Sequence, residues 1–355
     1  MTVVRGRARG AVRGPVGVLG LVLLVVLVAL VYVLHRRTAQ LGELALPLRT
    51  VAQTELPGST SRFDYASLDP VAHRLFIAHL GDSELLTVDT TTNQVVRRTA
   101  GLAAVHGVLV VPALHRVYAT ATATGTNQLV ALDETSGAEL WRAPTGSYPD
   151  GIAYAPTTGQ LWVSNEDAGG QSVVDAATGR VVGSVPLGGE AGNVAVDSGA
   201  SGGSAAVLVD VQTSNEVLRI DPVTRRVLHR TALPGCQHDH GLAILPAQRL
   251  AFIACDGNAV LEVLALTSGR ISQHIRVGRD PDVLAVDPTR GTVLVAAESG
   301  LVTTLHVQGR RVQLTGRAPL AGGAHVVAVD TGTGQAYWPL ADAHGRPQLL
   351  VTAPR

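Results

Sequence analysis

The feature of this sequence that most restricts its fold is a block of about 43 residues that occurs seven times in the 355-residue chain. Each copy begins with a short apolar run, turns tightly, and continues into a second apolar run and then into two more. Short apolar runs joined by such turns indicate β-hairpins. Four strands per repeat are typical of the blades of a β-propeller. The sequence therefore predicts an all-β fold, a seven-bladed β-propeller with four-stranded blades over residues 48–355.

One polar residue near the start of each first strand aligns the repeats. The intervals between these residues are 42, 44, 43, 47, 42 and 43. The residues are Asp64, His106, Asp150, Asn193, His240, Asp282 and His325. The long interval contains the Gly- and Ser-rich segment 198–204, which we interpret as a loop insertion.

The seventh repeat is too short to supply its own fourth strand, because the chain ends 30 residues after His325. Residues 48–58 (LRTVAQTELPG) match the fourth-strand segment of the fifth repeat, residues 229–235 (HRTALPG). We expect this N-terminal strand to pair with the last blade, since closing the ring leaves no unpaired sheet edge.

The N-terminal region has the charge pattern of a membrane anchor. Residues 1–14 are basic and contain four arginines, and residues 16–34 within the apolar segment 15–35 carry no charge. This length suits a helix that crosses a bilayer, and the arginine excess on its N-terminal side predicts a cytoplasmic N-terminus. We interpret 15–35 as a single-pass transmembrane signal anchor and 36–47 as a linker. The propeller would then lie on the extracytoplasmic side of the cell membrane. The alternative is a cleaved signal peptide.

Composition narrows the range of partners. Lys and Arg together number 28, as do Asp and Glu, and aromatic residues make up 3% of the chain. A balanced charge offers nothing to a polyanion, and scarce aromatics offer no platform for stacked bases, so we expect no nucleic-acid partner. We expect a monomeric propeller that binds a small-molecule or protein ligand. The sequence leaves the choice between these two ligands open.

The two cysteines, Cys236 and Cys255, both lie near the fifth repeat's first hairpin. In an exported protein such a pair predicts a disulfide. The alternative is a zinc site formed by the two cysteines with His238 and His240, although the spacing is unusual for zinc.

One segment resembles a known family. Residues 161–165 (LWVSN), which follow the turn 156–159, are similar to the Tyr-Val-Thr-Asn repeat of the YVTN-family β-propellers. Residues 75–79 and 117–121 are looser copies. The resemblance implies a propeller with WD40-like repeats over 48–355. Because the family includes surface and binding proteins, it implies no particular reaction.

The geometry of a blade predicts where function would lie. The first strand lies nearest the axis and starts at one mouth of the channel, and the antiparallel second strand ends at the same mouth. A second ring of strand ends should therefore surround the first ring. Its residues are His79, Ala121, Asn165, Asp210, Cys255, Ala297 and Leu340, with Glu166, Asp256 and Glu298 one position further on. From the two rings we select as candidate ligand-binding residues Asp64, His106, Asp150, Asn193, His240, Asp282, His325, His79, Asn165 and Glu298.

Two classes of function fit these rings. The first is a membrane-anchored, extracytoplasmic binding module, since Asp and His on one surface can hold a ligand. The second is a metal-dependent lyase or hydrolase similar to the streptogramin-lyase type of propeller, with His240 and Glu298 as the nearest counterparts of its residues. A divalent metal held by a subset such as Asp64, His106 and His325 is possible, and no other cofactor is assigned. The alternative to both is structural: Asp and Asn commonly bond backbone groups at strand starts.

Overall fold

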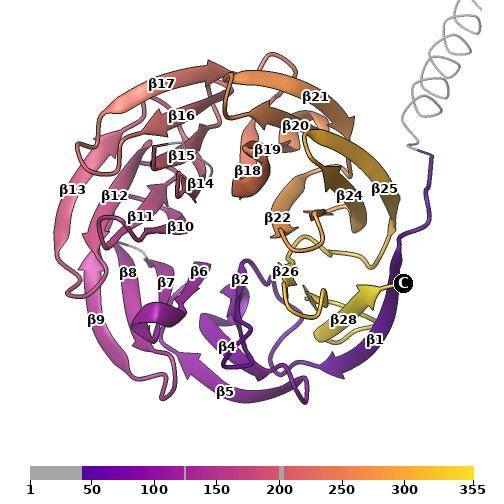
Figure 1. Ribbon diagram of the computed structural model, residues 1–355. Helices are drawn as coiled ribbons and strands as arrows, with labels where there is room; N and C mark the ends of the chain where they lie inside the picture. Colours follow the sequence, from indigo (N-terminus) through magenta and orange to yellow (C-terminus); the bar gives the residue numbers. More distant parts are fainter. Residues whose placement is uncertain (1–41, 124, 200–203) are drawn as a thin grey trace, which may run out of the picture. The chain divides into compact units, whose positions relative to one another are not determined.

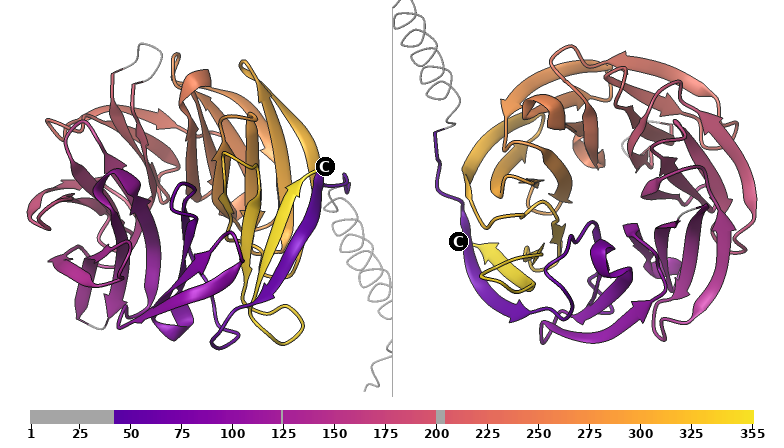
Figure 2. Two further views of the ribbon diagram at one scale, coloured as in Figure 1. Left: turned by 60° about the horizontal axis from the view of Figure 1, so that its bottom comes forward. Right: turned by 180° about the vertical axis from the view of Figure 1, so that it is seen from behind.

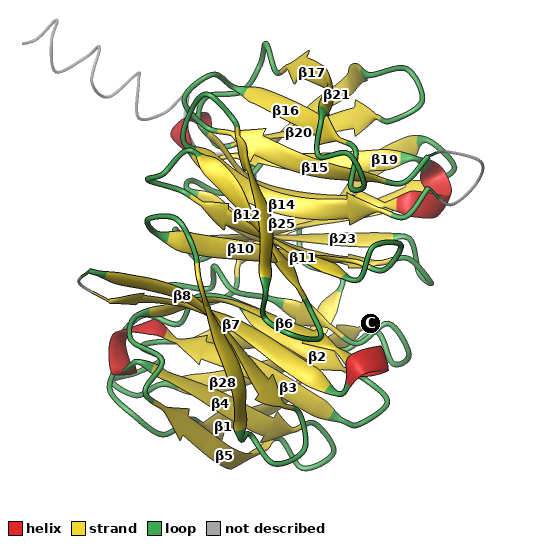
Figure 3. Ribbon diagram, turned by 90° about the vertical axis from the view of Figure 1, so that its left-hand side faces the viewer, coloured by secondary structure: helices red, strands yellow, loops and turns green. Residues whose placement is uncertain are grey.

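The computed structural model describes residues 42–123, 125–199 and 204–355. In this part of the chain, seven antiparallel sheets of four strands stand around a central channel (Figure 1). Strands dominate, and the helical turns are short (Figure 3). The predicted seven-bladed propeller with four-stranded blades is confirmed.

The first three blades follow chain order from the channel outwards. Blade 1 contains β2 (Ala66–Asp69), β3 (Arg74–His79), β4 (Glu84–Asp89) and β5 (Gln94–Ala100). Blade 2 contains β6 (Val105–Val111), β7 (Arg116–Ala123), β8 (Thr126–Asp133) and β9 (Glu139–Pro144). Blade 3 contains β10 (Pro149–Ala155), β11 (Gln160–Asn165), β12 (Gly170–Asp175) and β13 (Val181–Pro186).

Three further blades repeat this order, and the last one differs. Blade 4 contains β14 (Ala191–Asp197), β15 (Ala206–Val211), β16 (Glu216–Ile220) and β17 (Val227–Ala232). Blade 5 contains β18 (Asp239–Leu245), β19 (Leu250–Cys255), β20 (Val260–Ala265) and β21 (Arg270–Arg276). Blade 6 contains β22 (Pro281–Asp287), β23 (Thr292–Ala297), β24 (Leu301–Gln308) and β25 (Arg311–Pro319). Blade 7 contains β26 (Ala328–Val329), β27 (Ala336–Leu340), β28 (Gln348–Pro354) and β1 (Leu48–Glu55). The short helical turns are η1 (Leu80–Asp82), η2 (Pro112–Leu114), η4 (Pro246–Gln248) and η5 (Asp256–Asn258).

Burial explains the pattern of apolar runs. A second strand such as β19 is buried along its whole length because neighbouring blades cover both faces of the sheet. An outer strand such as β5 alternates exposed and partly buried residues, since one of its faces meets water. Apolar clusters join adjacent blades, as where Trp162 of blade 3 packs with Val207 of blade 4. The core is therefore a series of inter-blade layers around the channel (Figure 2).

The ring closes by pairing the two ends of the propeller. β1 pairs antiparallel with β28 from Leu48 opposite Pro354 to Glu55 opposite Gln348, with one β-bulge after Thr50. β1 forms the outer edge of blade 7, beside the C-terminus (Figure 1). The predicted closure by the N-terminal strand is confirmed.

Cys236 and Cys255 form a disulfide, with their Cα atoms 5.3 Å apart. The predicted bond is confirmed, and the alternative zinc site is wrong because both sulfurs are used in the bond. The bond links the loop before β18 to the end of β19, and both cysteines are buried. Closing a loop of this size contributes about 3 kcal/mol by the loop-entropy model.

The predicted cytoplasmic tail, the transmembrane segment and most of the linker lie outside the described residues. Among the residues that the structure does describe, no helix is long and apolar enough to cross a membrane.

Deleting residues 48–55 should destabilise all seven blades together, because it opens the ring and exposes the edge of β28. We expect the melting temperature to fall by on the order of 10 °C or more in a single cooperative transition. Differential scanning calorimetry measures this, with deletion of residues 200–203 from the Gly- and Ser-rich segment 198–204 as the control. An unchanged melting temperature for the strand deletion would show that closure does not stabilise the propeller.

Candidate functional site: an ionisable cup at the channel mouth

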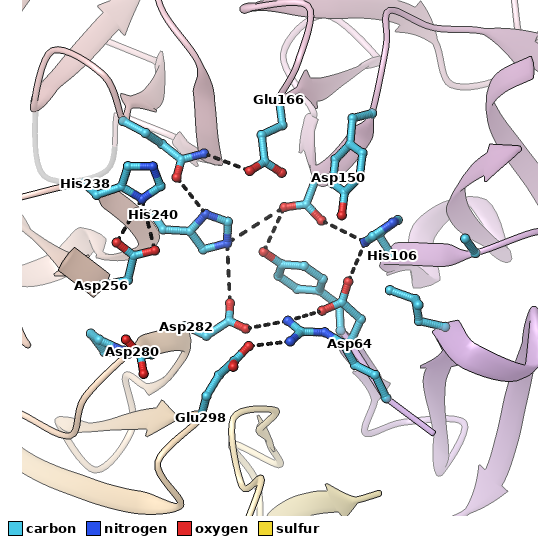
Figure 4. A pocket seen from close by; sticks show the side chains of 17 residues that line it. Asp64, His106, Asp150, Glu166, His238, His240, Asp256, Asp280, Asp282 and Glu298 are labelled. Carbon is cyan, nitrogen blue, oxygen red and sulfur yellow. Dashed lines mark hydrogen bonds and ion pairs between the residues drawn. The ribbon is translucent and has the colours of Figure 1, made fainter. Parts of the chain in front are cut away.

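A cavity of about 510 Å³ opens at the mouth of the channel where the first strands begin (Figure 4). We call the residues that line it the cup. They come from the first six blades: Arg62, Asp64, Tyr65, Leu80, Ala104, His106, Tyr148, Asp150, Glu166, Gln212, His238, His240, Asp256, Asp280, Pro281, Asp282 and Glu298.

A local break in the strand register accompanies these side chains at the mouth. In blades 2 to 6 the pairing of the first two strands shifts near the first strand's start, as between Val105 and Val108 or between Pro149 and Ile152. A bulge of this kind re-aims side chains relative to the regular pleat. The shift therefore falls on the polar residue of each of these repeats, such as His106 or Asp150.

Arg62 is the hub of the cup. Its Nη2 atom lies 3.1 Å from Asp64 Oδ1 and 3.2 Å from Asp282 Oδ2, and its Nη1 atom donates to Glu298. The residue precedes β2 in the connection that leads from β1, so one guanidinium joins carboxylates of blades 1 and 6. Hydrogen bonds to charged groups are stronger than neutral ones, so this contact fixes the two blades relative to each other at the mouth.

The His106 imidazole bonds one of these carboxylates. Its Nδ1 atom lies 2.8 Å from Asp64 Oδ2, and its ring stands beside the Tyr148 ring with centroids 4.7 Å apart. Burial opposes the charged imidazolium, but the bond to Asp64 and the nearby Asp150 charge outweigh it and raise the pKa of His106.

The His240 imidazole is held from both sides. Its Nε2 atom lies 3.4 Å from Asp282 Oδ1, and its Nδ1 atom lies 3.3 Å from Gln212 Oε1. Burial opposes the charge here too, yet the bond to Asp282 and the carboxylates around it raise the pKa of His240 to about 10. The same interaction lowers the pKa of Asp282 against the opposing effect of burial. Gln212 in turn donates to Glu166 at 3.3 Å.

Asp150 lies between the two histidines but within hydrogen-bond distance of neither (Figure 4). Its oxygens are 3.9 Å from His106 Nδ1 and 4.0 Å from His240 Nε2, and it accepts a bond of 3.2 Å from the Tyr65 hydroxyl. It is 4% exposed, and its burial together with the Asp64 charge raises its pKa to about 7. The protein therefore places a carboxyl group at the centre of the cup without a hydrogen-bonded cation.

Six of the ten candidate residues meet in the cup: Asp64, His106, Asp150, His240, Asp282 and Glu298. Asn193 is not among the lining residues but donates to the hydroxyl of Tyr65, which is, at 2.7 Å. The structure places the remaining three, His79, Asn165 and His325, outside its lining.

These three side chains are engaged in local contacts. His79 packs against the Phe63 ring and bonds Ser61 at 3.1 Å. Asn165 donates to Gly170 O and Ser172 Oγ, across the turn that begins the next strand. The two ring nitrogens of His325 face the carbonyl oxygens of Gly323 and Phe63 at 3.1 and 3.0 Å. These three side chains therefore fit the structural alternative, in which the polar residues of the rings bond or pack against nearby groups of the fold.

Sequence reasoning missed several cup residues: Arg62, Tyr65, Tyr148 and Gln212. One sequence signal for Tyr65 exists, because three of the other repeats have glycine at its position: Gly107, Gly151 and Gly241. Any Cβ at Gly151 would come within 2.5 Å of Asn193 Oδ1. The remaining three repeats have valine there, so blade 1 is the one repeat with an aromatic, hydrogen-bonding side chain at this position.

The structure brings together other possible metal ligands than the sequence predicted. Among the described residues, Asp64 belongs to two groups whose possible ligand atoms lie within 4.8 Å of one another. One contains His106 and Asp150, and the other contains Asp282 and His325. The predicted subset of Asp64, His106 and His325 is not such a group. Arg62 pairs with both carboxylates of the second group but with Asp64 alone in the first, so the first group keeps one carboxylate, Asp150, that is free of Arg62.

His240 and Glu298, the two residues predicted to correspond to a streptogramin-lyase site, do not contact each other through an ion pair or hydrogen bond among the described residues. Glu298 bonds Arg62, whereas His240 bonds Asp282 and Gln212. The two side chains that would correspond to a streptogramin-lyase site are thus committed to different partners.

Comparison with known proteins gives the fold and nothing finer. No protein-family model matches the chain, and no curated protein matches it. Among solved structures, the chain is similar to the hydrazine synthase of Kuenenia stuttgartiensis, with a TM-score of 0.68, 16% identity, and coverage of 85% of this chain and 97% of that one. It is also similar to the WD40 repeats of RRP9 (TM-score 0.71, 12% identity, 89% and 100% covered) and to U3-55K (TM-score 0.71, 12% identity, 88% and 100% covered). The chain is a seven-bladed propeller with WD40-like structural neighbours.

Replacing Asp282 with Asn should lower the pKa of His240 from about 10 by roughly one unit or more, since it removes a charged acceptor. In the wild type, the charged imidazole stabilises the fold fully below pH 6.5, and this contribution is lost as the pH rises towards 10. NMR titration of the His240 ring measures the shift, with the exposed Asp167→Asn variant as the matched control. An equal pKa in both variants would contradict the assigned pair.

Proposed function

We propose that this chain is a membrane-anchored, extracytoplasmic binding module whose cup holds a small organic cation. The observation that carries the proposal is the charge of the cup. Seven carboxyl groups line it, against one guanidinium and three imidazoles. Opposite charge favours a bound cation, and the concave site partly shields it from solvent.

The carboxyl groups are unequally neutralised. Asp64, Asp282 and Glu298 share Arg62, and Asp256 lies 2.9 Å from His238 Nδ1. Among the described residues, Glu166 and Asp280 have no ion pair, and Asp150 has no cation within hydrogen-bond distance. The carboxyl groups left for a ligand are therefore Asp150, Glu166 and Asp280, and the first two lie near the Tyr148 side chain.

The protonation of Asp150 and Glu166 would respond to a bound cation. Burial is the main cause that raises the pKa of both Asp150 and Glu166. A bound ammonium would favour the charged carboxylates and displace their protons. Affinity for a cation should therefore rise as the pH increases through about 7, the pKa of Asp150 in the empty cup.

A divalent metal is the second candidate ligand, favoured by the group of Asp64, His106 and Asp150. The same group would be the metal site of the alternative function, a metal-dependent lyase or hydrolase. A stoichiometric divalent ion in the purified protein would favour this alternative over the organic cation.

Thermal-shift measurements with agmatine, cadaverine and tetramethylammonium, and separately with Mg²⁺, Mn²⁺ and Zn²⁺, test the proposal. We expect an organic cation to raise the melting temperature by on the order of 5 °C at a hundredfold excess over Kd. Asp150→Asn should weaken binding about tenfold or more, whereas Glu139→Gln should leave it unchanged, because Glu139 lies exposed on the outer strand β9 away from the cup. A cup that responds only to anions, or equally in both variants, would refute the cation assignment.

Anchoring and location rest on sequence and on the disulfide. The uncharged run 16–34, with arginines concentrated before it, supports a single-pass anchor with a cytoplasmic N-terminus. The Cys236–Cys255 bond supports an extracytoplasmic propeller, since disulfides persist in oxidising compartments. Protease added to intact cells or spheroplasts should digest the propeller and leave an N-terminal fragment in the membrane. Digestion only after cell lysis would place the propeller in the cytoplasm.

We also infer that the chain is a divergent YVTN-type propeller. Residues 161–165 support this because they occupy β11, the second strand of blade 3, and residues 75–79 and 117–121 occupy β3 and β7, the same strand of other blades. Sequences of near relatives test the inference. The motif should recur in their second strands, and its absence there would make the resemblance coincidental.

A further inference from the structure

A second cavity, of about 470 Å³, lies between blades 1 and 2 on the face opposite the cup. Its walls are the β2–β3 turn, the outer strand β5, and the β6–β7 and β8–β9 turns of the next blade. We propose that this cleft binds the guanidinium or ammonium end of an alkyl chain through the carboxyl groups of Glu134 and Asp69. The site is separate from the cup and does not depend on the function proposed for it.

Glu134 is a buried acid with an unused oxygen. The residue is 5% exposed, its Oε1 atom has no hydrogen-bond partner among the described residues, and its side chain lines the cleft. Asp69, 3% exposed, lines the same cleft. A buried carboxyl oxygen without a donor is costly. Asp69 is the side chain that bonds the Glu134 carboxyl, and two acids can do so only by sharing a proton, so a cationic donor would be a better partner for both.

The other blades show that the fold does not need an acid at this position. The backbone N–H of Glu134 bonds the carbonyl oxygen of His115, the last residue of the preceding turn, at 3.1 Å. The same backbone bond is made in other blades by Thr90, Ala176 and Leu266. Neutral side chains of quite different size satisfy the fold there, and the carboxyl group of blade 2 has no counterpart among them.

The cleft between blades 4 and 5 shows which kind of group pairs with the acid that ends the first strand. Asp197 ends β14 as Asp69 ends β2, and Arg249 of the next blade lies 2.6 Å from it. Arg249 and His115 both close a β-turn with positive φ, at 56° and 51°. The guanidinium that fills the blade 4/5 cleft is thus replaced in the blade 1/2 cleft by an exposed histidine and a cavity.

The other charged groups of the cleft are committed elsewhere. Arg74 bonds Asp89 at 2.7 Å and the His73 carbonyl at 3.0 Å, and Arg97 donates to the Thr135 carbonyl. Among the described residues, neither Glu134 nor Asp69 forms an ion pair. Val71, 86% exposed, and Val96, 50% exposed, line the cleft and offer an apolar contact for the alkyl part of a ligand.

The protonation of Glu134 makes cation binding at the cleft depend on pH. Burial, and then the adjacent Asp69 and Asp133 carboxyls, raise its pKa to about 7, while Arg74 opposes them. His115 lines the same cleft. A bound guanidinium would displace the proton from Glu134, so binding should strengthen as the pH rises above 7.

Methyl NMR of the purified full-length chain, titrated with n-propylguanidinium, tests the proposal at Val71 and Val96. We expect saturable shifts at the methyl groups of these two valines, and none with n-propylurea, which has the same shape without the charge. Glu134→Gln should weaken binding about tenfold or more, whereas Glu139→Gln, on the exposed strand β9, should not. Equal shifts with n-propylurea, or unchanged binding to Glu134→Gln, would overturn the proposal.

Two further measurements refine and challenge the assignment. Tighter binding of the tripeptide Gly-Arg-Gly than of n-propylguanidinium would identify an arginine of a partner chain as the ligand, and the reverse order would identify a free small molecule. His115→Arg, which copies Arg249, should raise the melting temperature and abolish n-propylguanidinium binding, and Glu134→Gln should remove that thermal gain. A His115→Arg variant that binds n-propylguanidinium like the wild type would contradict the inferred geometry.

Discussion

The pairing of β1 with β28 is the constraint on which the rest of the molecule depends. It closes the ring, and it also fixes where the chain enters blade 1. The connection from β1 to β2 runs inwards from the outer edge of blade 7 and carries Arg62 to the channel mouth. There Arg62 binds Asp64 of blade 1 together with Asp282 and Glu298 of blade 6. One continuous segment of the chain therefore both closes the ring, through β1, and supplies the arginine that joins blades 1 and 6 at the channel mouth.

The sequence predicted the fold well because a propeller is periodic. Seven polar residues at nearly constant spacing locate seven first strands, and the blades then follow from the turn residues. Cys236 and Cys255 were paired correctly because the second strand of a blade returns beside the loop that precedes the first. Arg62 could not be found in this way, since it lies in the one connection that the repeat does not describe. The role of His325 also depends on atoms invisible to periodicity, the carbonyls of Gly323 and Phe63.

Differences between repeats carry the functional information. Where several blades have the same kind of residue, packing or backbone bonding explains it, as with the glycines that follow the polar residue. Tyr65 stands where the other blades have glycine or valine, and its hydroxyl donates to Asp150. Glu134 replaces a neutral residue and reaches an empty cleft. In both places one blade differs from the others at an equivalent position and has an ionisable or hydrogen-bonding side chain that lines a cavity.

The central claim is that Asp150 is a binding group for a cation because no cationic side chain lies within hydrogen-bond distance of it, and a ¹³C NMR titration of its carboxyl group tests that claim most directly. In the ligand-free protein the pKa of Asp150 should lie near 7. When the cup is saturated with an organic cation, the pKa should fall towards or below the ordinary value of about 3.9. A ligand-free Asp150 that already titrates near its ordinary value would mean that the cup is neutralised without a ligand, and the account of its function would be wrong.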